Sequence, residues 1–333
     1  MFELTRALIE IESITGNEER VGNFLADRLA PLAARFDGRV ERMPVESNRF
    51  NVLAHWGDPV VTLSTHMDTV PPFFSSSEDD EFIHGRGACD TKGIIAAMIT
   101  AAADLVEAGV RGVAVLFVVG EERNSAGAYM AAANGRSSRF LINGEPTENK
   151  LALGSKGALR VEVAAHGRMA HSAYPELGES AIEKLLDALA EIRRMPLPTD
   201  SILGASTLNI GTISGGRAPN VVADRACAEL MIRLVDDGQA TRVALARAVQ
   251  GRAELNEVLA IPALHLDSLA GLETTVVAYT TDIPAFNGAW GRPYLLGPGT
   301  IHVAHTAEER VPKAQLSEAV GIYKNMVQQL IRG

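Results

Sequence analysis

The sequence predicts an α/β protein with two domains: one built on a mostly parallel sheet with helices on both faces, and an inserted ferredoxin-like domain. Three observations predict this fold. A chain of 333 residues is long for a single core. Residues 1–156 alternate helical and strand patterns, which is typical of α/β domains. The middle third has the order βαββαβ, which is the ferredoxin-like pattern.

The elements of the first domain are predicted from apolar spacing. Residues 18–36 have apolar side chains at helical intervals, with Val21, Leu25 and Leu29 on one side. Residues 113–120, VAVLFVVG, are apolar throughout, as expected of a parallel strand covered on both faces. The same reasoning places helices at 92–109 and 126–135 and strands at 60–66 and 139–144. After the insert we expect a helix at 272–282, a strand at 293–299 and a helix at 316–331.

The inserted domain is predicted at residues 157–265, so that residues 1–156 and 266–333 form the first domain. Alternating polar and apolar residues indicate strands, and two amphipathic stretches indicate helices. The strands are expected at 157–167, 205–216, 226–236 and 253–264. The helices are expected at 179–195 and 238–251.

Composition narrows the class of protein. Hydrophobic residues make up 47% and charged residues 22%, as in ordinary soluble enzymes. A formal net charge of −10 argues against nucleic-acid binding, which needs clustered Lys and Arg. The N-terminus has no signal-peptide pattern, and no apolar run approaches the roughly 18 residues that span a bilayer. The chain has two cysteines, Cys89 and Cys227, which are too few for a disulfide framework. We therefore expect a cytoplasmic protein that binds neither membrane nor nucleic acid.

Polar side chains stand at the ends of the predicted strands of the first domain. The carboxyl ends of parallel strands form a ligand crevice, so residues far apart in sequence can converge there. Imidazole and carboxylate groups together suit zinc and similar divalent cations. The candidates are His66, Asp68, Asp90, Glu121, Glu122, Glu145 and His305.

Each candidate also has a purely structural explanation. His66 and Asp68, two residues apart on one strand, can form a simple hydrogen-bonded pair. Asp90 can cap the following helix. Consecutive glutamates are usually exposed, and Glu145 precedes a proline, as in many turns. A separate structural explanation at each of five element ends would be a coincidence. The candidates taken together therefore favour a metal site.

Five segments resemble, in order along nearly the whole chain, the motifs of the M20 metallopeptidases. These are two-metal amidohydrolases that include acetylornithine deacetylase, succinyl-diaminopimelate desuccinylase and glutamate carboxypeptidase. The resemblance implies a catalytic domain with an inserted dimerisation domain that also acts as a lid. The segments are STHMDTVP (64–71), GRGACDTKG (85–93), GEE (120–122), GEPT (144–147) and AHTAEERV (304–311).

The resemblance also assigns roles. Glu121 would be the general base, and Asp68 would orient His66. Two cations roughly 3.5–4 Å apart can share and activate a water, which a base not bound to metal can deprotonate. Zinc is the expected ion, with cobalt or manganese as substitutes. One zinc would be held by His66, Asp90 and Glu145, and a second by Asp90, Glu122 and His305.

In the inserted domain, residues 165–185 resemble the family's dimerisation motif. His171 would reach across a dimer interface to donate to the oxyanion of the substrate. Asn220 and Arg233 match positions that bind the substrate carboxylate, for which a guanidinium is well suited. In the first domain, Gly297 and Gly299 could let backbone N–H groups approach the same ligand, although glycines in turns are commoner than glycines that form anion sites.

Two segments depart from the family pattern. Gly120 stands where many relatives have Asp, but this is not a ligand position. Residues 278–286, AYTTDIPAF, replace a Gly-Ser-Asp type stretch that contacts substrate in the family. Thr280 and Asp282 are expected to face the site.

These observations predict a dizinc hydrolase, homodimeric through the inserted domain, that cleaves an N-acyl amino acid in the manner of acetylornithine deacetylase. The alternative within the class is a carboxypeptidase or dipeptidase acting on small peptides. A non-catalytic metal-binding module and a structural scaffold are disfavoured, because Glu121 and a complete ligand set are present.

Overall fold

The computed structural model describes residues 1–135 and 138–332 and divides into two compact units. Unit 1 comprises Met1–Leu153, Leu266–Thr275 and Thr281–Gly333. Unit 2 comprises Gly154–His265 and Val276–Thr280. The insert therefore begins three residues before the predicted position, and a second short segment also belongs to unit 2.

Unit 1 is built on a six-stranded sheet in the order β1-β2-β6-β3-β7-β17. The four strands from β6 to β17 are parallel, which confirms the prediction of a mostly parallel sheet. The antiparallel hairpin of β1 and β2 was not predicted. The strands are β1 (Arg39–Glu46), β2 (Arg49–Trp56), β3 (Val61–His66), β6 (Val113–Val118), β7 (Phe140–Asn143) and β17 (Arg292–Leu295).

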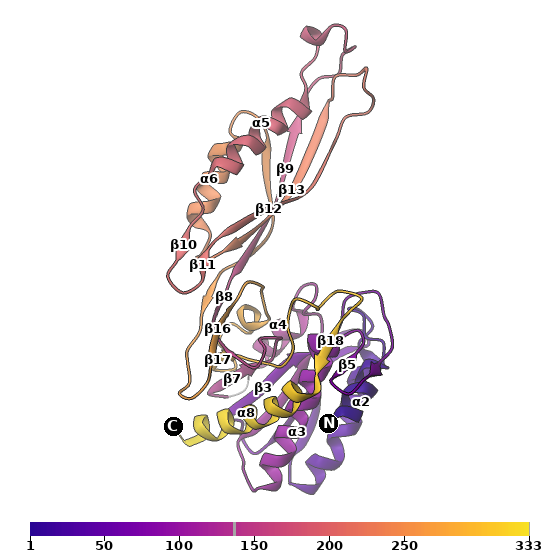
Figure 1. Ribbon diagram of the computed structural model, residues 1–333, viewed down its shortest axis with the longest axis vertical. Coiled ribbons are helices and arrows are strands. Elements are labelled where there is room, and N and C mark those ends of the chain that lie inside the picture. The colour runs from indigo at the N-terminus through magenta and orange to yellow at the C-terminus, as the bar shows by residue number, and fades with distance from the viewer. Residues whose placement is uncertain (136–137, 333) are drawn as a thin grey trace. The chain divides into compact units, whose positions relative to one another are not determined.

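Helices cover both faces of this sheet (Figure 1). Strand β6 is apolar at every position because both of its faces are covered. Val115 and Phe117 enter one core, and Leu116 and Val118 enter the other. The first core is shared with α1 (Phe2–Ile9), α2 (Glu19–Arg35), α3 (Gly93–Glu107) and α8 (Lys313–Arg332). The second is shared with α4 (Ala126–Ala133) and α7 (Ile283–Phe286).

The predicted helix at 272–282 is wrong. The chain instead forms strand β16 (Thr274–Val277), followed by the short helix α7. Four consecutive β-branched residues explain the difference, because their side chains are restricted in a helix and pack well in a strand.

The remaining short strands are β4 (Ser77–Glu78), β5 (Phe82–His84), β8 (Leu151–Ser155), β10 (Thr199–Asp200), β11 (Gly204–Ala205), β15 (Leu264–His265) and β18 (Arg310–Pro312).

Unit 2 has the predicted βαββαβ order. Its antiparallel sheet, in the order β12-β13-β9-β14, is covered on one face by α5 and α6. On β13, alternate residues such as Leu230 and Ile232 enter this core, so Met231 and Arg233 lie on the other face. The elements are β9 (Gly157–His166), α5 (Ala181–Arg194), β12 (Thr207–Gly215), β13 (Arg225–Leu234), α6 (Gln239–Val249) and β14 (Glu254–Ile261).

Within residues 1–135 and 138–332, the helices are too short or too polar to cross a bilayer.

Candidate metal centre

Asp90 lies between two histidines in unit 1. His66 ends β3, and its Nε2 is 2.9 Å from Asp90 Oδ1. His305, in the loop before β18, has its Nε2 3.2 Å from Asp90 Oδ2. Each oxygen of one buried carboxylate thus faces a different imidazole, which is the geometry expected of a bridging ligand.

Two glutamates complete the same arrangement. Glu122, just after β6, has Oε2 3.1 Å from the Nε2 atom of His305. Glu145, just after β7, has Oε1 4.0 Å from the Nε2 atom of His66. The structure therefore brings together the residues of the two ligand sets that the resemblance implies, with Asp90 between His66 and His305.

The hydrogen bonds of His66 indicate which ring nitrogen faces the centre. Nδ1 lies 3.0 Å from the backbone oxygen of Asp68, which can only accept, so Nδ1 carries the proton. In the neutral ring the lone pair of Nε2 then faces Asp90 Oδ1. Two acceptors at this distance need a proton or a cation between them. The Asp68 carboxylate also lies near this nitrogen, with Oδ1 3.5 Å from Nδ1, and its role in orienting His66 stays a prediction.

The residues present fit divalent cations. Ligand atoms of His66, Asp90 and Glu122 all lie within 4.8 Å of one another. Glu145 Oε1 is buried and has no hydrogen-bond partner within the described residues. An unpaired buried carboxylate is costly unless a positive charge compensates it. Mixed imidazole nitrogen and carboxylate oxygen donors are those that zinc and related ions accept.

Crowding of carboxylates shifts several pKa values. Burial raises the pKa of the Glu121 and Glu145 carboxyls well above the usual range, and neighbouring carboxylates add to this. Hydrogen bonds to Asp90 and Glu122 raise the pKa of His305 to about 10. If all these carboxyls were ionised, their negative charge would exceed what the two histidines can balance, so a bound cation would favour the ionised forms.

Asp282 lies near Glu121. It is buried at the start of α7, and its carboxylate is close enough to raise the pKa of Glu121. Burial raises the pKa of Asp282 itself to about 7. Thr280 is half-buried and belongs to unit 2, so its substrate contact stays a prediction.

Gly297 and Gly299 have a different role from the expected one. The N–H of Gly297 donates to Thr147 Oγ1 at 3.1 Å, and that of Gly299 donates to Gln315 Oε1 at 2.8 Å. Both donors are therefore engaged within the chain and are not offered to a ligand. A Cβ at position 299 would lie 2.6 Å from that of Cys89, so glycine is needed for close packing against the Asp90 loop.

A buried ion pair behind Asp90 was not anticipated. Arg86 Nη1 donates to Glu309 Oε2 at 2.5 Å, and both side chains are at most 2% exposed. Glu309 Oε1 accepts from the backbone N–H of Asp90 at 3.3 Å. The pair thus joins the loop that carries Asp90 to the segment that follows His305. The two residues are 223 positions apart, so no local pattern marks them as partners.

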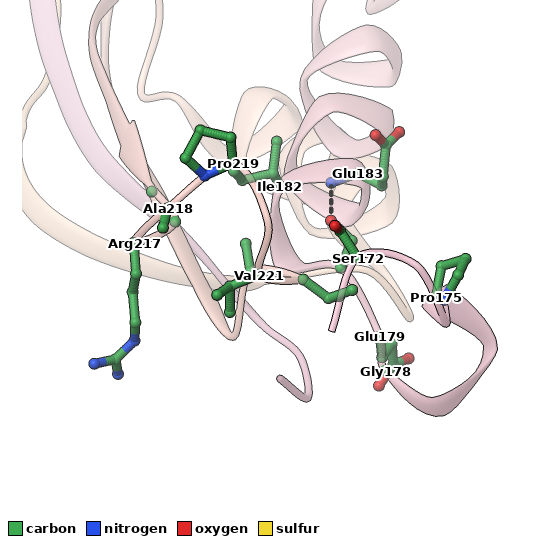
Figure 2. Close-up of a pocket in the computed structure, with 15 residues that line it drawn as sticks. Ser172, Pro175, Gly178, Glu179, Ile182, Glu183, Arg217, Ala218, Pro219 and Val221 are labelled. Carbon is green, nitrogen blue, oxygen red and sulfur yellow. Dashed lines mark hydrogen bonds between the residues drawn. The ribbon is translucent and has the colours of Figure 1, made fainter. Parts of the chain in front are cut away.

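Unit 2 contains a cavity of about 740 Å³ (Figure 2). One side is formed by Ser172, Pro175 and Gly178, and the other by residues 215–219 and 221–223, between which Asn220 lies in the chain. His171 forms a backbone bridge with Val221 at the edge of the cavity. Arg233 lies farther along β13 on the face not covered by helices.

The chain was compared with known protein families and curated proteins. Residues 62–329 match the peptidase family M20/M25/M40. A peptidase M20 domain-containing protein of Schizosaccharomyces pombe is 40% identical over 344 aligned residues, which cover 100% of this chain and 85% of the relative. The chain belongs to the M20 family. As an M20 peptidase it is a hydrolase acting on C–N bonds.

Further relatives of this M20 chain agree in sequence and fold. A probable carboxypeptidase of Aspergillus fumigatus is 39% identical over 373 aligned residues, covering 97% of the chain and 85% of the relative. Among solved structures, a Staphylococcus aureus tripeptidase superposes with a TM-score of 0.85 at 22% identity, covering 100% and 98% of the two chains. A dinuclear metal-binding M20 peptidase of Bacillus subtilis gives 0.71 at 16%, covering 99% and 96%. These two structures support the fold.

Proposed function

We propose that this M20 chain is a two-metal peptidase that releases an amino acid from the carboxyl end of small peptides. The observation that carries the proposal is the placement of Asp90 between His66 and His305, with Glu145 and Glu122 beside one histidine each. The probable carboxypeptidase of A. fumigatus supports the choice of substrate.

The ligands would be His66, Asp90 and Glu145 for one cation, and Asp90, Glu122 and His305 for the other. When bound, two divalent cations, with zinc as the expected ion, polarise the scissile carbonyl and lower the pKa of a water.

Glu121 belongs to neither ligand set and acts as the general base. It takes a proton from the attacking water and gives it to the leaving amine. Burial raises the pKa of this carboxyl, and the neighbouring carboxylates of Glu145, Asp282 and Glu122 add to the effect. Glu121 is therefore a stronger base than an exposed glutamate, which suits proton transfer near neutral pH.

Arg233 is the proposed contact for the terminal carboxylate of the substrate. Its guanidinium has no hydrogen bond or ion pair within the described residues, although the side chain is half-buried. Burial lowers the pKa of Arg233, as expected for a cation lacking a carboxylate partner. A planar guanidinium binds a carboxylate through two parallel hydrogen bonds. Asn220 and Thr280 are proposed to contact the same substrate.

His171 is the proposed donor to the oxyanion of the substrate in the neighbouring subunit. The N–H of Ala173 donates to His171 Nδ1 at 3.1 Å, so the neutral ring carries its proton on Nε2. His171→Ala should lower kcat by roughly 10²–10³, the usual scale for one oxyanion donor, while bound metal stays unchanged. His166→Ala, at another exposed histidine of unit 2, is the matched control. Full turnover by His171→Ala would exclude the role.

A homodimer through unit 2 is part of this proposal. Strand β12 is an edge of its sheet, and Ile213 on that strand is 57% exposed. Helix α5, which packs beside β12, exposes Ile182 and Leu186. An unpaired edge beside exposed apolar side chains suits pairing with a second copy. A monomer in sedimentation that retains full activity would exclude the dimer.

The test of function is release of free amino acid from dipeptides, tripeptides and N-acyl amino acids, with added zinc and with chelator. Peptides with a free carboxyl end should be cleaved, the same peptides with an amidated end should not, and chelator should abolish turnover. Turnover of N-acetyl amino acids alone would instead support the acetylornithine deacetylase-like function. No turnover despite bound metal would overturn both.

A further inference from the structure

We propose that Thr15 is a positioning residue, which holds the Asp68 carboxylate so that this carboxylate fixes the turn carrying Glu121 and Glu122. The inference rests on the proposed function for its kinetic consequence. Its structural part, a hydroxyl that controls the backbone of residues 120–122, stands on the contacts of Asp68 alone.

The Asp68 carboxylate is fully buried and collects hydrogen bonds from three consecutive backbone N–H groups. Its Oδ1 accepts from Gly120 at 3.0 Å and from Glu121 at 3.2 Å. Its Oδ2 accepts from Glu122 at 3.3 Å. Asp68 therefore acts mainly on the turn that presents the general base and one proposed metal ligand. Its support of His66 comes chiefly through its backbone oxygen.

Thr15 provides the shortest hydrogen bond of this cluster. Its Oγ1 donates to Asp68 Oδ2 at 2.7 Å, and the residue is 8% exposed. Without Thr15, only the long bond from Glu122 would hold Oδ2. The carboxylate would then be free to turn about its last side-chain bond, and its bonds to the N–H groups of residues 120–122 would loosen.

The backbone around Thr15 is held independently of its hydroxyl. The N–H of Thr15 donates to the Thr69 oxygen at 3.2 Å, and the N–H of Thr69 donates to the Ser13 oxygen at 3.0 Å. Ser13 Oγ donates to the Met67 oxygen at 2.8 Å. Residues 13–15 therefore stay alongside residues 67–69 when the hydroxyl is removed. A variant at position 15 tests the hydrogen bond with little other change.

The experiment compares Thr15→Val, which has the same shape without the hydroxyl, with Thr15→Ser, which keeps it. Backbone amide exchange is measured in the metal-free and zinc-loaded full chain, together with kcat and KM. Thr15→Val should speed exchange at residues 120–122 and lower kcat about 10–100-fold, the scale for losing a partner of a metal-site residue. KM should change less than about twofold, because substrate binding groups are untouched. Thr15→Ser should restore both readouts.

Thr5→Val is the matched control, because Thr5 is also buried and donates its hydroxyl to a backbone oxygen, that of Met1. It should leave exchange at residues 120–122 unchanged. Thr15→Ala serves as a second variant without the hydroxyl, should the valine variant not fold. Unchanged exchange at residues 120–122 in either would overturn the proposal, as would an equal increase over all of unit 1. If the wild type turns over no peptide, the proposed function fails, while the exchange result still decides the role of Thr15.

Discussion

Glu121→Gln should retain two equivalents of bound metal and lose a factor of roughly 10²–10⁴ in kcat, because an amide of the same shape cannot take up a proton from water. Within the described residues Glu121 has no hydrogen bond or ion pair with a histidine, whereas Glu122 Oε2 lies 3.1 Å from His305 Nε2. The measurement is metal content by elemental analysis beside steady-state turnover of a dipeptide.

Glu122→Gln is the matched control for that prediction. It changes the adjacent side chain in the same way, but it should weaken binding of one metal ion, because the proposed ligand loses its charge. Loss of metal in the Glu121 variant with retention in the Glu122 variant would show that the two roles are exchanged. Full turnover by Glu121→Gln would remove it from the mechanism.

Glu309→Leu should lower the stability of unit 1 by about 3–5 kcal/mol, because it leaves the buried Arg86 guanidinium without its partner. The measurement is urea unfolding of the metal-free protein, followed by tryptophan fluorescence. Both tryptophans, Trp56 and Trp290, are fully buried in unit 1, so this signal reports on the unit that contains the pair.

Two further variants make this stability test specific. Arg86→Met combined with Glu309→Leu removes both charges and should recover much of the loss, since no unpaired charge stays buried. Asp104→Asn disrupts the exposed pair with Lys324 in the same unit and should cost less than about 1 kcal/mol. A loss of that small size in Glu309→Leu would show that the buried pair is not a major contributor.

Much of the fold was predictable because local patterns agree with it. Strand β6 is apolar at every position because both of its faces are covered, and the βαββαβ order of unit 2 follows from alternation along each strand. His66, Asp90, Glu122, Glu145 and His305 were found because each follows or precedes a recognisable element. The parallel sheet places His66, Glu122 and Glu145 at the carboxyl ends of β3, β6 and β7, whereas Asp90 and His305 come from the segments before α3 and β18.

The contacts that support these residues could not be found in the same way. Thr15 and Asp68 are 53 positions apart, and Arg86 and Glu309 are 223 apart, with no local pattern that marks either pair. The engagement of the Gly299 N–H by Gln315 depends on where α8 packs, which spacing alone does not predict. Strand β16 was missed because Leu272 and Val276 also fit a helical interval.

The path of the chain has a consequence for biosynthesis. Strand β17 completes the sheet of unit 1 by pairing with β7, yet all of unit 2 is synthesised between the two strands. His305 follows Glu122 by 183 residues. A nascent chain that has not reached His305 can therefore contain a folded unit 2, while the β7 edge is unpaired and the metal centre lacks a ligand. The long loop between β7 and β17 adds little entropic cost to their pairing, because each doubling of loop length costs about 0.6 kcal/mol. Until β17 has been synthesised, the β7 edge is open to pairing with other chains.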